Sequence, residues 1–418
     1  MLMCLSCRPV SLEKTTKMTL DKGSALRDPW SVCQWMKMLH TSRFFWLLCA
    51  LTLTTMGITV MNHQRLTPTT EFFDPRPSRI DPRPSRIYPN RTRLLISTYL
   101  RSGSTLTGAI IQSSDDVFYV FEPLLMIYEK WRHSKLPLKF FNQQSELFKD
   151  NNNFEKNAIK TVEEIWNCSF ENIDLDTLTQ FHMQESKTTK AYFKCTQRNP
   201  GVNGIVACLP DLKDLCRSRR INSQKVVRLP LRLVSPLMQK YPDLKIIHLV
   251  RDPRASILSQ YVRLKYFQWS HLQKYAEMFC ARIHEDLGTT ANLARTYPRR
   301  IKLVRYETMA EHPLHIAEDL YQFADLTFTK EARQFVYDRT LSGKKDTNCV
   351  TCLVKSNASV AANKWRTSIG LRAAQAIDAK CGEVYTLLGY KPVKTIPDLK
   401  NLSHSLKIND IKFAEMSI

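Results

Sequence analysis

Short apolar runs recur along the chain from residue 93 to about residue 391, and longer helix-compatible stretches separate them. The runs lie at 94–96, 117–120, 226–227, 246–250 and 301–304. The run at 246–250 is nearly unbroken and contains β-branched residues, which is typical of a strand buried on both faces of a parallel sheet. This alternation predicts an α/β fold, with a P-loop-like parallel sheet flanked by helices.

The first apolar run leads into a short polar turn. Arg101, Ser102, Gly103, Ser104 and Thr105 form this turn, and an apolar, helix-compatible segment follows it. A small-residue turn between a strand and a helix start directs several backbone N–H groups, and the positive end of the helix dipole, at one point. The turn therefore predicts a cradle for a phosphate or sulfate group.

A nucleotide P-loop and an ordinary surface turn are two other interpretations of this segment. In the nucleotide P-loop pattern G-x-x-x-x-G-K-[ST], the first Gly would fall on Thr98 and the Lys on Ser104, so the turn does not match that pattern. The cation stands instead at Arg101, before the Gly. Taken alone, the turn also fits an ordinary surface turn with a solvated arginine.

A second anion-binding pattern follows the fourth apolar run. Arg251 stands at the carboxyl end of this predicted strand, and Asp252, followed by a proline, is a good helix start. Ser256 and Ser259 then fall about one turn apart on the same helix face. Because open α/β sheets bind ligands beyond the carboxyl ends of their strands, we expect Arg251 and a serine of this helix to reach one anionic group.

These patterns together resemble the Golgi carbohydrate 6-O-sulfotransferases, which act on galactose, N-acetylglucosamine or N-acetylgalactosamine. The resemblance is carried, in the same order along the chain, by segments 101–105, 117–123, 249–255, 303–307, 364–366, Cys381 and 388–390. It implies that 3′-phosphoadenosine-5′-phosphosulfate (PAPS) is the sulfate donor and that no metal is needed, because arginines neutralise the phosphates. The Leu-Gly-Tyr-Lys segment slightly favours the keratan-sulfate galactose branch. The chain departs from the family pattern after Ser104 and at Leu125-Met126, near the expected acceptor side.

The resemblance and the chemistry of group transfer assign roles to the two anion-binding patterns. Charge grows on the leaving oxygen during sulfuryl transfer, so positioned cations and N–H donors matter most. We expect Arg101, with the N–H groups of Ser102 to Thr105, to neutralise the sulfate and the 5′-phosphate. Arg251 and Ser259 are expected to bind the 3′-phosphate, unless Arg251 only pairs with Asp252 or caps a helix.

Glu122, at the end of a predicted strand, is the expected general base for the acceptor hydroxyl. Its apolar neighbours Phe121, Pro123 and Leu124 predict a raised pKa. A structural salt bridge is the alternative. His248 lies inside an apolar strand, so we interpret it as a core histidine.

Other residues near the expected site have less definite roles. Trp365 and Arg366 either form a wall of the donor site or only contribute packing, and Arg254 is expected to face solvent. The polar region 140–222 resists assignment and is expected to contain much of the acceptor specificity.

Charge and hydropathy divide the rest of the chain. The 418-residue chain carries a formal net charge of +22, which suits an anionic membrane surface, an acidic polymer or nucleic acid. A basic segment (1–43) precedes a charge-free apolar segment (44–61), which predicts a cytoplasmic tail and a type II signal anchor. The proline-rich repeat within 62–92 predicts an extended stem, followed by a lumenal domain (93–391) and a C-terminal tail (392–418).

Cysteines and glycosylation sequons agree with a lumenal domain. Eight cysteines follow the anchor, which suggests disulfides without fixing their pairing, since eight cysteines allow 105 complete pairings. Cys349 and Cys352 also fit half of a zinc or redox site. Sequons stand at Asn90, Asn167, Asn357 and Asn401, which fits a glycoprotein.

The sequence therefore predicts a Golgi type II membrane enzyme that transfers sulfate from PAPS to the 6-hydroxyl of galactose or an N-acetylhexosamine in a glycan. The expected partners are the glycan acceptor and the Golgi membrane; lumenal placement argues against nucleic acid, and a homo-oligomer is compatible with the sequence. Two other classes remain: a P-loop kinase-like enzyme acting on nucleotides, and a catalytically silent glycan-binding membrane protein.

Overall fold

The computed structural model describes residues 91–133, 136–345 and 354–408. The predicted cytoplasmic tail, the signal anchor and nearly all of the stem lie outside these residues, as do Cys349 and Cys352. Within the described ranges, no helix is both long and apolar enough to cross a bilayer.

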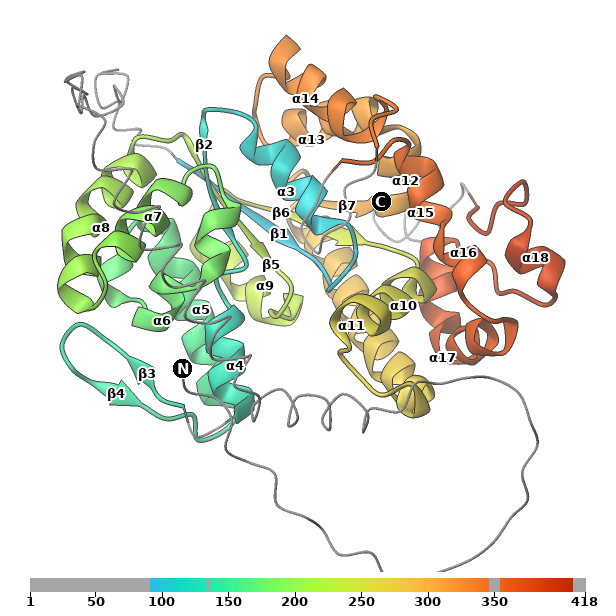
Figure 1. Ribbon diagram of the computed structural model, residues 1–418, viewed down its shortest axis with the longest axis horizontal. Helices are drawn as coiled ribbons and strands as arrows, with labels where there is room; N and C mark the ends of the chain where they lie inside the picture. The colour runs from blue at the N-terminus through green and yellow to red at the C-terminus, as the bar shows by residue number, and fades with distance from the viewer. Residues whose placement is uncertain (1–90, 134–135, 346–353, 409–418) are drawn as a thin grey trace, which may run out of the picture. The chain divides into compact units, whose positions relative to one another are not determined.

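A parallel sheet lies in the middle of the described domain (Figure 1). Its five strands stand in the order β2-β5-β1-β6-β7, and every neighbouring pair is parallel. The strands are β1 (Thr92–Ser97), β2 (Val117–Phe121), β5 (Ile221–Val226), β6 (Leu244–Val250) and β7 (Ile301–Arg305). Each predicted apolar run overlaps one strand, so the predicted sheet is confirmed.

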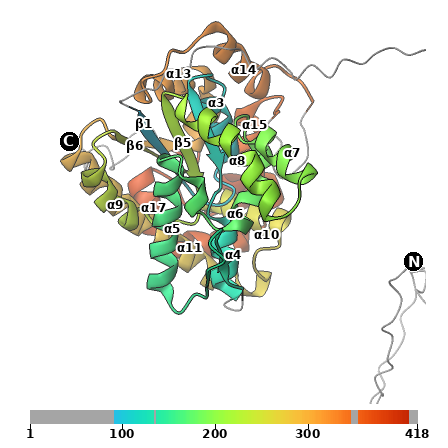
Figure 2. The ribbon, with the colours of Figure 1, turned by 90° about the vertical axis from the view of Figure 1, so that its left-hand side faces the viewer.

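Helices cover both faces of the sheet, because successive strand residues face opposite sides. Leu94 and Ile96 of β1 pack into one cluster with residues of α3 (Ser104–Gln112), α13 (Pro313–Phe323) and α14 (Lys330–Thr340). Leu95 packs into another, with residues of α5 (Asn151–Trp166) and α9 (Leu231–Lys240). Figure 2 shows α5 beside the sheet strands, with α13 at the opposite end of the view.

Strand β5 is longer and more polar than the predicted run at 226–227. Its residues Asn222 to Lys225 are polar, yet all are buried. The Nδ2 atom of Asn222 donates to the Ile165 carbonyl, and the Nε2 atom of Gln224 donates to the Val162 carbonyl, both at 2.8 Å. Hydrogen bonds to α5 therefore offset the cost of burying polar groups in a central strand, which hydrophobicity alone did not predict.

Helices form most of the remaining structure, including the region that resisted assignment from sequence. Their bounds, with those of the short antiparallel pair, are β3 (Leu138–Lys139), β4 (Ser145–Glu146), α4 (Leu125–His133), η2 (Phe170–Asn172), α6 (Leu175–Thr179), η3 (Phe181–Glu185), α7 (Lys190–Arg198), α8 (Val202–Arg217), α10 (Pro253–Leu264), η4 (Trp269–His271), α11 (Leu272–Thr296), α12 (Tyr306–Glu311), α15 (Ala358–Asn363), α16 (Trp365–Ser368), α17 (Leu371–Leu388) and α18 (Ile396–Lys400).

Disulfides connect helices in two separate parts of the described domain. In the described residues, Cys168 pairs with Cys216, Cys195 with Cys208, and Cys280 with Cys381. The first two stabilise the region from α5 to α8, and the third joins α11 to α17. This pairing, which the sequence left open, agrees with folding in an oxidising compartment.

The described part of the C-terminal segment packs against the domain through Arg366. This side chain is buried and donates hydrogen bonds to the carbonyl oxygens of Leu399, His404, Asp398 and Asn401. Arg366 therefore anchors residues 398–404, in agreement with the packing interpretation of this residue.

Candidate functional site

One residue of the candidate site follows each of the five strands, at the edge of the sheet where their carboxyl ends lie. Glu122 follows β2, Arg228 comes shortly after β5, Arg101 lies in the loop after β1, Arg251 follows β6 and Tyr306 follows β7. In the order of the strands across the sheet, this gives a carboxylate at one side and a series of cations toward the other. Parallel sheets bind ligands at this edge.

The loop from β1 to α3 forms the predicted cradle. Helix α3 begins at Ser104. The N–H groups of Ser104 and Thr105 therefore precede the first intrahelical acceptor, whereas those of Leu106 and Thr107 donate to the Gly103 carbonyl. Gly103 is the N-cap with φ of 88°, a conformation that favours glycine. A Cβ atom at Gly103 would also lie 2.1 Å from Cδ2 of Tyr306. Two separate constraints therefore require glycine at this position.

Arg101 connects the cradle to the residues predicted to bind the 3′-phosphate. Its Nε atom donates to Oγ of Ser259 at 3.0 Å, and its carbonyl oxygen accepts from Nη1 of Arg251 at 3.0 Å. Burial, followed by the positive charge of Arg251, lowers the pKa of the Arg101 guanidinium. Two nearby guanidinium groups repel each other, so an anion between them would be stabilised by both. The structure thus brings Arg101, Arg251 and Ser259 together.

Helix α10 begins as the sequence predicts and contacts the cradle. The Asp252 side chain accepts from the Arg254 backbone N–H and caps the helix, with Pro253 as its first residue. Oγ of Ser256 lies 3.4 Å from Oγ of Ser102. The two predicted serines on this helix, Ser256 and Ser259, therefore both face the loop between β1 and α3.

Tyr306 and Glu307 support this arrangement from the end of β7. The guanidinium carbon of Arg251 lies 4.6 Å from the centre of the Tyr306 ring, and that ring packs on Gly103. Oε1 of Glu307 accepts from the Asp252 N–H at 3.1 Å, which fixes the start of α10. The Nε atom of Arg251 is buried without a hydrogen-bond partner among the described residues. This donor of Arg251 is therefore unsatisfied by the described part of the protein.

Glu122 lies in a buried ion-pair cluster, and its pKa differs from the prediction. Its Oε1 accepts from Nζ of Lys225 at 2.6 Å, and its Oε2 accepts from Nη1 of Arg228 at 2.5 Å. Burial alone raises the pKa of Glu122, but the charges of Lys225 and Arg228 outweigh it and lower the pKa to about 2. The expected rise in pKa is therefore wrong, because sequence neighbours did not reveal two cations from β5 and the loop that follows it.

The backbone at Glu122 is also unusual. Its φ of 44° lies in the left-handed region, which a residue with a β-carbon adopts rarely. The Glu122 N–H donates to the Lys225 carbonyl at 3.0 Å, so the backbone and the side chain of Glu122 both contact the same residue. Such strained positions persist only where surrounding contacts hold them, and they cluster at functional sites.

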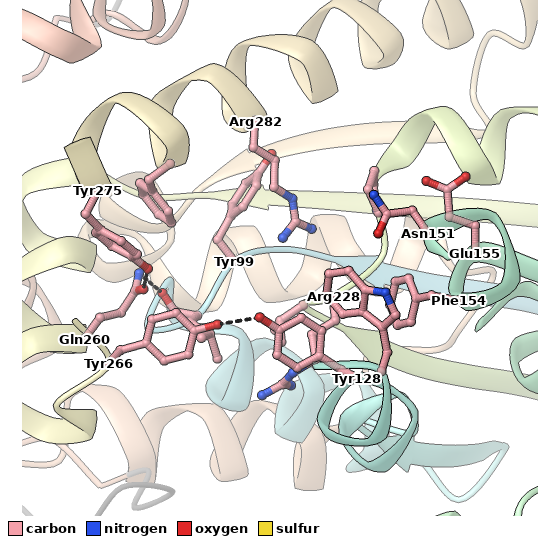
Figure 3. Close-up of a pocket in the computed structure, with 15 residues that line it drawn as sticks. Tyr99, Tyr128, Asn151, Phe154, Glu155, Arg228, Gln260, Tyr266, Tyr275 and Arg282 are labelled. Atoms are coloured by element: carbon pink, nitrogen blue, oxygen red, sulfur yellow. Dashed lines mark hydrogen bonds between the residues drawn. The ribbon is translucent and has the colours of Figure 1, made fainter. Parts of the chain in front are cut away.

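A cavity of about 270 Å³ opens beside the cradle (Figure 3). Its wall is shared with the site: Tyr99 and Leu100 come from the loop after β1, and Arg228 is the partner of Glu122. The rest of the lining is largely aromatic, namely Tyr128, Trp131, Phe154, Tyr266, Tyr275 and Phe279, with Arg282, Glu155, Asn151 and Gln260 among its polar members.

Hydrogen bonds across the cavity hold its walls together. The hydroxyl oxygens of Tyr128 and Tyr266 are 3.1 Å apart, which joins α4 to the segment after α10 (Figure 3). The Tyr275 hydroxyl donates to Oε1 of Gln260, and Nε2 of Gln260 donates to the Leu100 carbonyl at 3.0 Å. The cavity wall is thus bonded directly to the loop that forms the cradle.

A buried polar network lies behind this loop. The Tyr99 hydroxyl donates to Oδ2 of Asp286 at 2.9 Å and lies 3.0 Å from Nε2 of His248. His248 is fully buried, and its Nδ1 lies 2.8 Å from the Thr290 hydroxyl. Burial, and then the charge of Arg282, lower the pKa of His248 to about 3. The interpretation of His248 as a core histidine is therefore confirmed.

The burial of Arg254 and Trp365 tests what the sequence predicted for these two residues. Arg254 is fully buried, paired with Asp252 and Asp378, so the expectation that it faces solvent is wrong. Its guanidinium lies 4.9 Å from the ring centre of Trp365, which is itself buried in the core beside α10 and α17. Trp365 therefore packs on Arg254, in agreement with the packing interpretation.

Several residues of this site were missed from the sequence. Tyr306 and Lys225 were read only as parts of motifs at strand ends, although an aromatic and a cation at such positions are a usable signal. The aromatic lining of the cavity gave no signal, because its residues come from separate elements. Of the polar region 140–222, Asn151, Phe154 and Glu155 reach the cavity.

Comparison with known proteins identifies the family. The model of the family described as "Sulfotransferase family" matches residues 94–330, more than half of the 418-residue chain. The chain belongs to the sulfotransferase family. The matched segment of this sulfotransferase contains the cradle, Glu122, Arg251, Ser259 and the whole cavity lining.

Curated relatives cover most of the sulfotransferase. Carbohydrate sulfotransferase 3 of Mus musculus is 26% identical over 76% of this chain and 71% of its own length. Carbohydrate sulfotransferase 3 of Tetronarce californica is 28% identical, covering 76% and 77%, and carbohydrate sulfotransferase 1 of Danio rerio is 25% identical, covering 76% and 82%. Together with the family match, these relatives support a sulfotransferase enzyme.

Solved structures add a weaker likeness. The sulfotransferase domain from the Synechococcus PCC 7002 olefin synthase is 19% identical, covers 70% of this chain and 95% of its own, and superposes with a TM-score of 0.36. The family assignment rests on the sequence matches. In the described part of the chain, no group of three or more His, Cys, Asp and Glu residues is arranged to hold a metal ion.

Proposed function

We propose that this sulfotransferase transfers sulfate from PAPS to the 6-hydroxyl of galactose or an N-acetylhexosamine in a glycan. The observation that carries the proposal is the position of Arg101, which lies in the cradle after β1 and contacts both Arg251 and Ser259. Two guanidinium groups and a helix start converging at one strand edge suit a donor with phosphates at two positions.

The donor is held, in this proposal, by groups on either side of Arg101. The first-turn N–H groups of α3 and the Arg101 guanidinium bind the phosphosulfate end. Arg251 and Ser259 bind the 3′-phosphate, with Arg251 fixed against the Tyr306 ring. The loop packs closely on Tyr306 at Gly103, so a larger residue at Gly103 would displace the loop from this position.

Transfer forms a bond between sulfur and the acceptor oxygen, breaks the bond between sulfur and the 5′-phosphate oxygen, and releases the hydroxyl proton. Arg101 and the N–H groups of α3 stabilise the charge that grows on the leaving phosphate. Glu122, whose pKa is lowered to about 2, is ionised throughout the neutral range and is the proposed acceptor of the proton. Because it is a weak base, it takes the proton late, when bond formation has made the hydroxyl acidic.

The acceptor class is supported by the relatives and by the cavity. The matched relatives are named carbohydrate sulfotransferases. Sugar rings pack their apolar faces on aromatic side chains, and the cavity beside the cradle is lined by several of these. The 6-hydroxyl and the keratan-sulfate galactose branch come from the family resemblance of the sequence.

We also propose a Golgi type II membrane location, with the catalytic domain in the lumen. The charge-free segment 44–61 and the basic residues before it support a signal anchor. The three disulfides in the described residues agree with an oxidising lumen. Asn167, Asn357 and Asn401 of the sequons are exposed and accessible to glycosylation.

The full chain, expressed in animal cells and purified in mild detergent, tests the reaction. Radiolabelled PAPS is supplied with desulfated keratan, desulfated chondroitin and N-acetylglucosamine-terminated oligosaccharides, in the presence of EDTA. We expect label on one class of acceptor, at the 6-position of the sugar, and a loss of about 100- to 1,000-fold in Arg101→Ala. Methylation analysis or mass spectrometry of the product identifies the position.

Two measurements separate a wrong reaction from a damaged protein. Arg295→Gln, an exposed arginine on α11, serves as the charge-matched control and should keep full activity. Binding of 3′-phosphoadenosine-5′-phosphate is measured for each protein by calorimetry. A wild-type chain that binds neither this nucleotide nor PAPS would overturn the proposal, and glycan binding without donor binding would favour a silent glycan-binding protein.

A further inference from the structure

We propose that the aromatic cavity binds a sugar residue that carries a negatively charged substituent, either a carboxylate or a sulfate ester, and that Arg282 recognises this charge. The inference rests on the proposed function, because it concerns the acceptor side of the same site. It extends that function by naming the residues that select the acceptor.

The size and lining of the cavity suit one sugar ring. Its volume of about 270 Å³ lies near the lower end of the range for ligand pockets, roughly 300–1,000 Å³. Tyr128, Trp131, Phe154 and Tyr266 present aromatic rings, against which the C–H faces of a sugar can pack. One ring fills this space, so the rest of a glycan chain must lie outside it.

Arg282 supplies hydrogen-bond donors that have no acceptor among the described residues. Its guanidinium lies within the cavity, toward Arg228 and beside the Tyr99 ring (Figure 3). Its Nε and Nη2 atoms are buried, and none of the described residues is placed to accept a hydrogen bond from them. A buried donor without an acceptor is costly, so a ligand oxygen placed here would be stabilised strongly.

Asp286 holds Arg282 in place without satisfying these donors. The Asp286 carboxylate lies 3.6 Å from Nε of Arg282, beyond hydrogen-bond distance. Its two oxygens already accept from the Tyr99 hydroxyl at 2.9 Å and the Leu231 N–H at 2.7 Å. Arg282 is therefore oriented by an ion pair while its Nε and Nη2 donors stay without an acceptor among the described residues.

The balance of charge in the cavity lining favours an anionic substituent. The charged residues of the lining are Arg228, Arg282 and Glu155. Glu155 forms an ion pair with Arg232, and the partners of Arg228 and Arg282, Glu122 and Asp286, lie outside the lining. The lining itself therefore carries one more cation than anions. The Nε atom of Arg228 is also buried without a partner among the described residues. Guanidinium groups bind carboxylates and sulfates through paired N–H bonds.

The cavity is placed correctly for an acceptor rather than for an unrelated ligand. Tyr99 and Leu100 belong to the loop that ends in the cradle, and Arg228 bonds directly to Glu122. A sugar ring here therefore lies next to the proposed base and the donor loop, and the ring that accepts sulfate is its neighbour in the glycan. An acidic group bound at Arg282 would fix how that ring is oriented in the cavity.

Transfer kinetics with three acceptor oligosaccharides test the inference on the full chain. One is a neutral N-acetyllactosamine oligomer, the second carries a sulfate ester on the same backbone, and the third is a uronic-acid-containing oligomer of desulfated chondroitin. We expect at least one acidic acceptor to have a KM about 10- to 100-fold lower than the neutral one. Arg282→Gln should remove that advantage by raising the KM of the acidic acceptor to that of the neutral one, while binding of 3′-phosphoadenosine-5′-phosphate is retained.

Arg295→Gln is the matched control, because it removes an arginine from the same helix outside the cavity. Thermal unfolding and nucleotide binding verify that both variants are folded. Trp131→Leu should instead raise the KM for neutral and acidic acceptors together, because it removes packing rather than charge. The acidic acceptor that loses its advantage in Arg282→Gln identifies whether a carboxylate or a sulfate is recognised.

Three outcomes would overturn the inference: equal KM values for neutral and acidic acceptors in the wild type, an Arg282→Gln effect equal for all acceptors, or an equal effect of Arg295→Gln. Failure of the proposed function is recognised separately, as absence of transfer to every acceptor. In that case, direct calorimetric binding of the acidic disaccharides decides: binding that Arg282→Gln weakens supports the cavity assignment, and absence of binding overturns it.

Discussion

The two halves of the site, the proposed donor half and the proposed acceptor half, are built in different ways. The donor half consists of a loop and two helix starts, and Arg101, Arg251 and Ser259 lie within two short sequence segments. The acceptor half consists of side chains from α4, α5, the segment after α10 and α11, which are distant along the chain. Backbone groups form much of the donor half, and side chains form nearly all of the acceptor half.

This difference explains what each half can tolerate. A donor that is common to an enzyme class needs a fixed backbone cradle, and the close contact between Gly103 and Tyr306 leaves little freedom for change. A cavity formed by side chains changes its shape or charge with single substitutions and leaves the sheet intact. Substitutions on the two sides should therefore separate donor effects from acceptor effects.

The largest effect is expected at Glu122, where the two halves meet. Glu122→Gln leaves Lys225 and Arg228 buried without their carboxylate, which should lower the free energy of unfolding by about 3–5 kcal/mol. Chemical denaturation at neutral pH measures this. Adding Lys225→Met should recover part of the loss, since it removes one unpaired charge; a loss below about 1 kcal/mol in the single variant would contradict the buried ion pair.

Gly103→Ala should affect the donor half alone. The φ of 88° and the 2.1 Å approach of a Cβ to Tyr306 predict a displaced loop. We expect nucleotide binding and transfer to fall about 100-fold, while direct acceptor binding is kept. Gly288→Ala on α11 is the control, because a Cβ there meets nothing within 4 Å. Equal behaviour of the two variants would show that the cradle tolerates a side chain.

Low pH should reduce the contribution of Glu122 to the free energy of unfolding. Its pKa is lowered from 4.5 to about 2 in the folded chain, so its stabilising contribution is complete above pH 4.5 and is lost as the pH falls toward 2. The gap in unfolding free energy between wild type and Glu122→Gln should narrow by about 2 kcal/mol between pH 6 and pH 3. A gap that is independent of pH in this range would refute the lowered pKa.

The smallest expected effects are changes in KM that should be confined to either the donor or the acceptor. Arg251→Lys keeps a positive charge but loses the planar contact with Tyr306 and paired N–H bonds, so the KM for PAPS should rise about 10-fold with the acceptor KM unchanged. Tyr128→Phe removes the hydroxyl that faces Tyr266 and should change only the acceptor KM. Steady-state kinetics with each substrate varied in turn provide both KM values. A variant that alters both KM values equally would contradict the assignment of separate donor and acceptor halves.

The sequence predicted the donor half because its information is local. Hydrophobic runs located the strands, and Gly103, Asp252 and the proline after Asp252 marked the turns and helix starts beyond them. Strand β5 was only partly predicted, since its buried polar residues are stabilised by α5 carbonyls that a pattern of hydrophobicity does not register.

The acceptor half could not be predicted in the same way. The pKa of Glu122 depends on Lys225, which is 103 residues away, and the predicted direction was wrong because only sequence neighbours were considered. Tyr128 and Tyr266 meet across 138 residues. Contacts of this kind follow from the order of the strands and the packing of helices, so they appear only in three dimensions.

The ion pair between Lys225 and Glu122 also links chemistry to the assembly of the sheet. Phe121 of β2 lies opposite Lys225 of β5 in the parallel register, and Glu122 follows directly. A shift of β5 by one residue would turn the Lys225 side chain to the other face of the sheet and leave the carboxylate buried without it. Misaligned pairing of these two strands is therefore destabilised by an unpaired buried charge as well as by poor packing. The residue proposed for proton transfer thus also favours the correct strand register during folding.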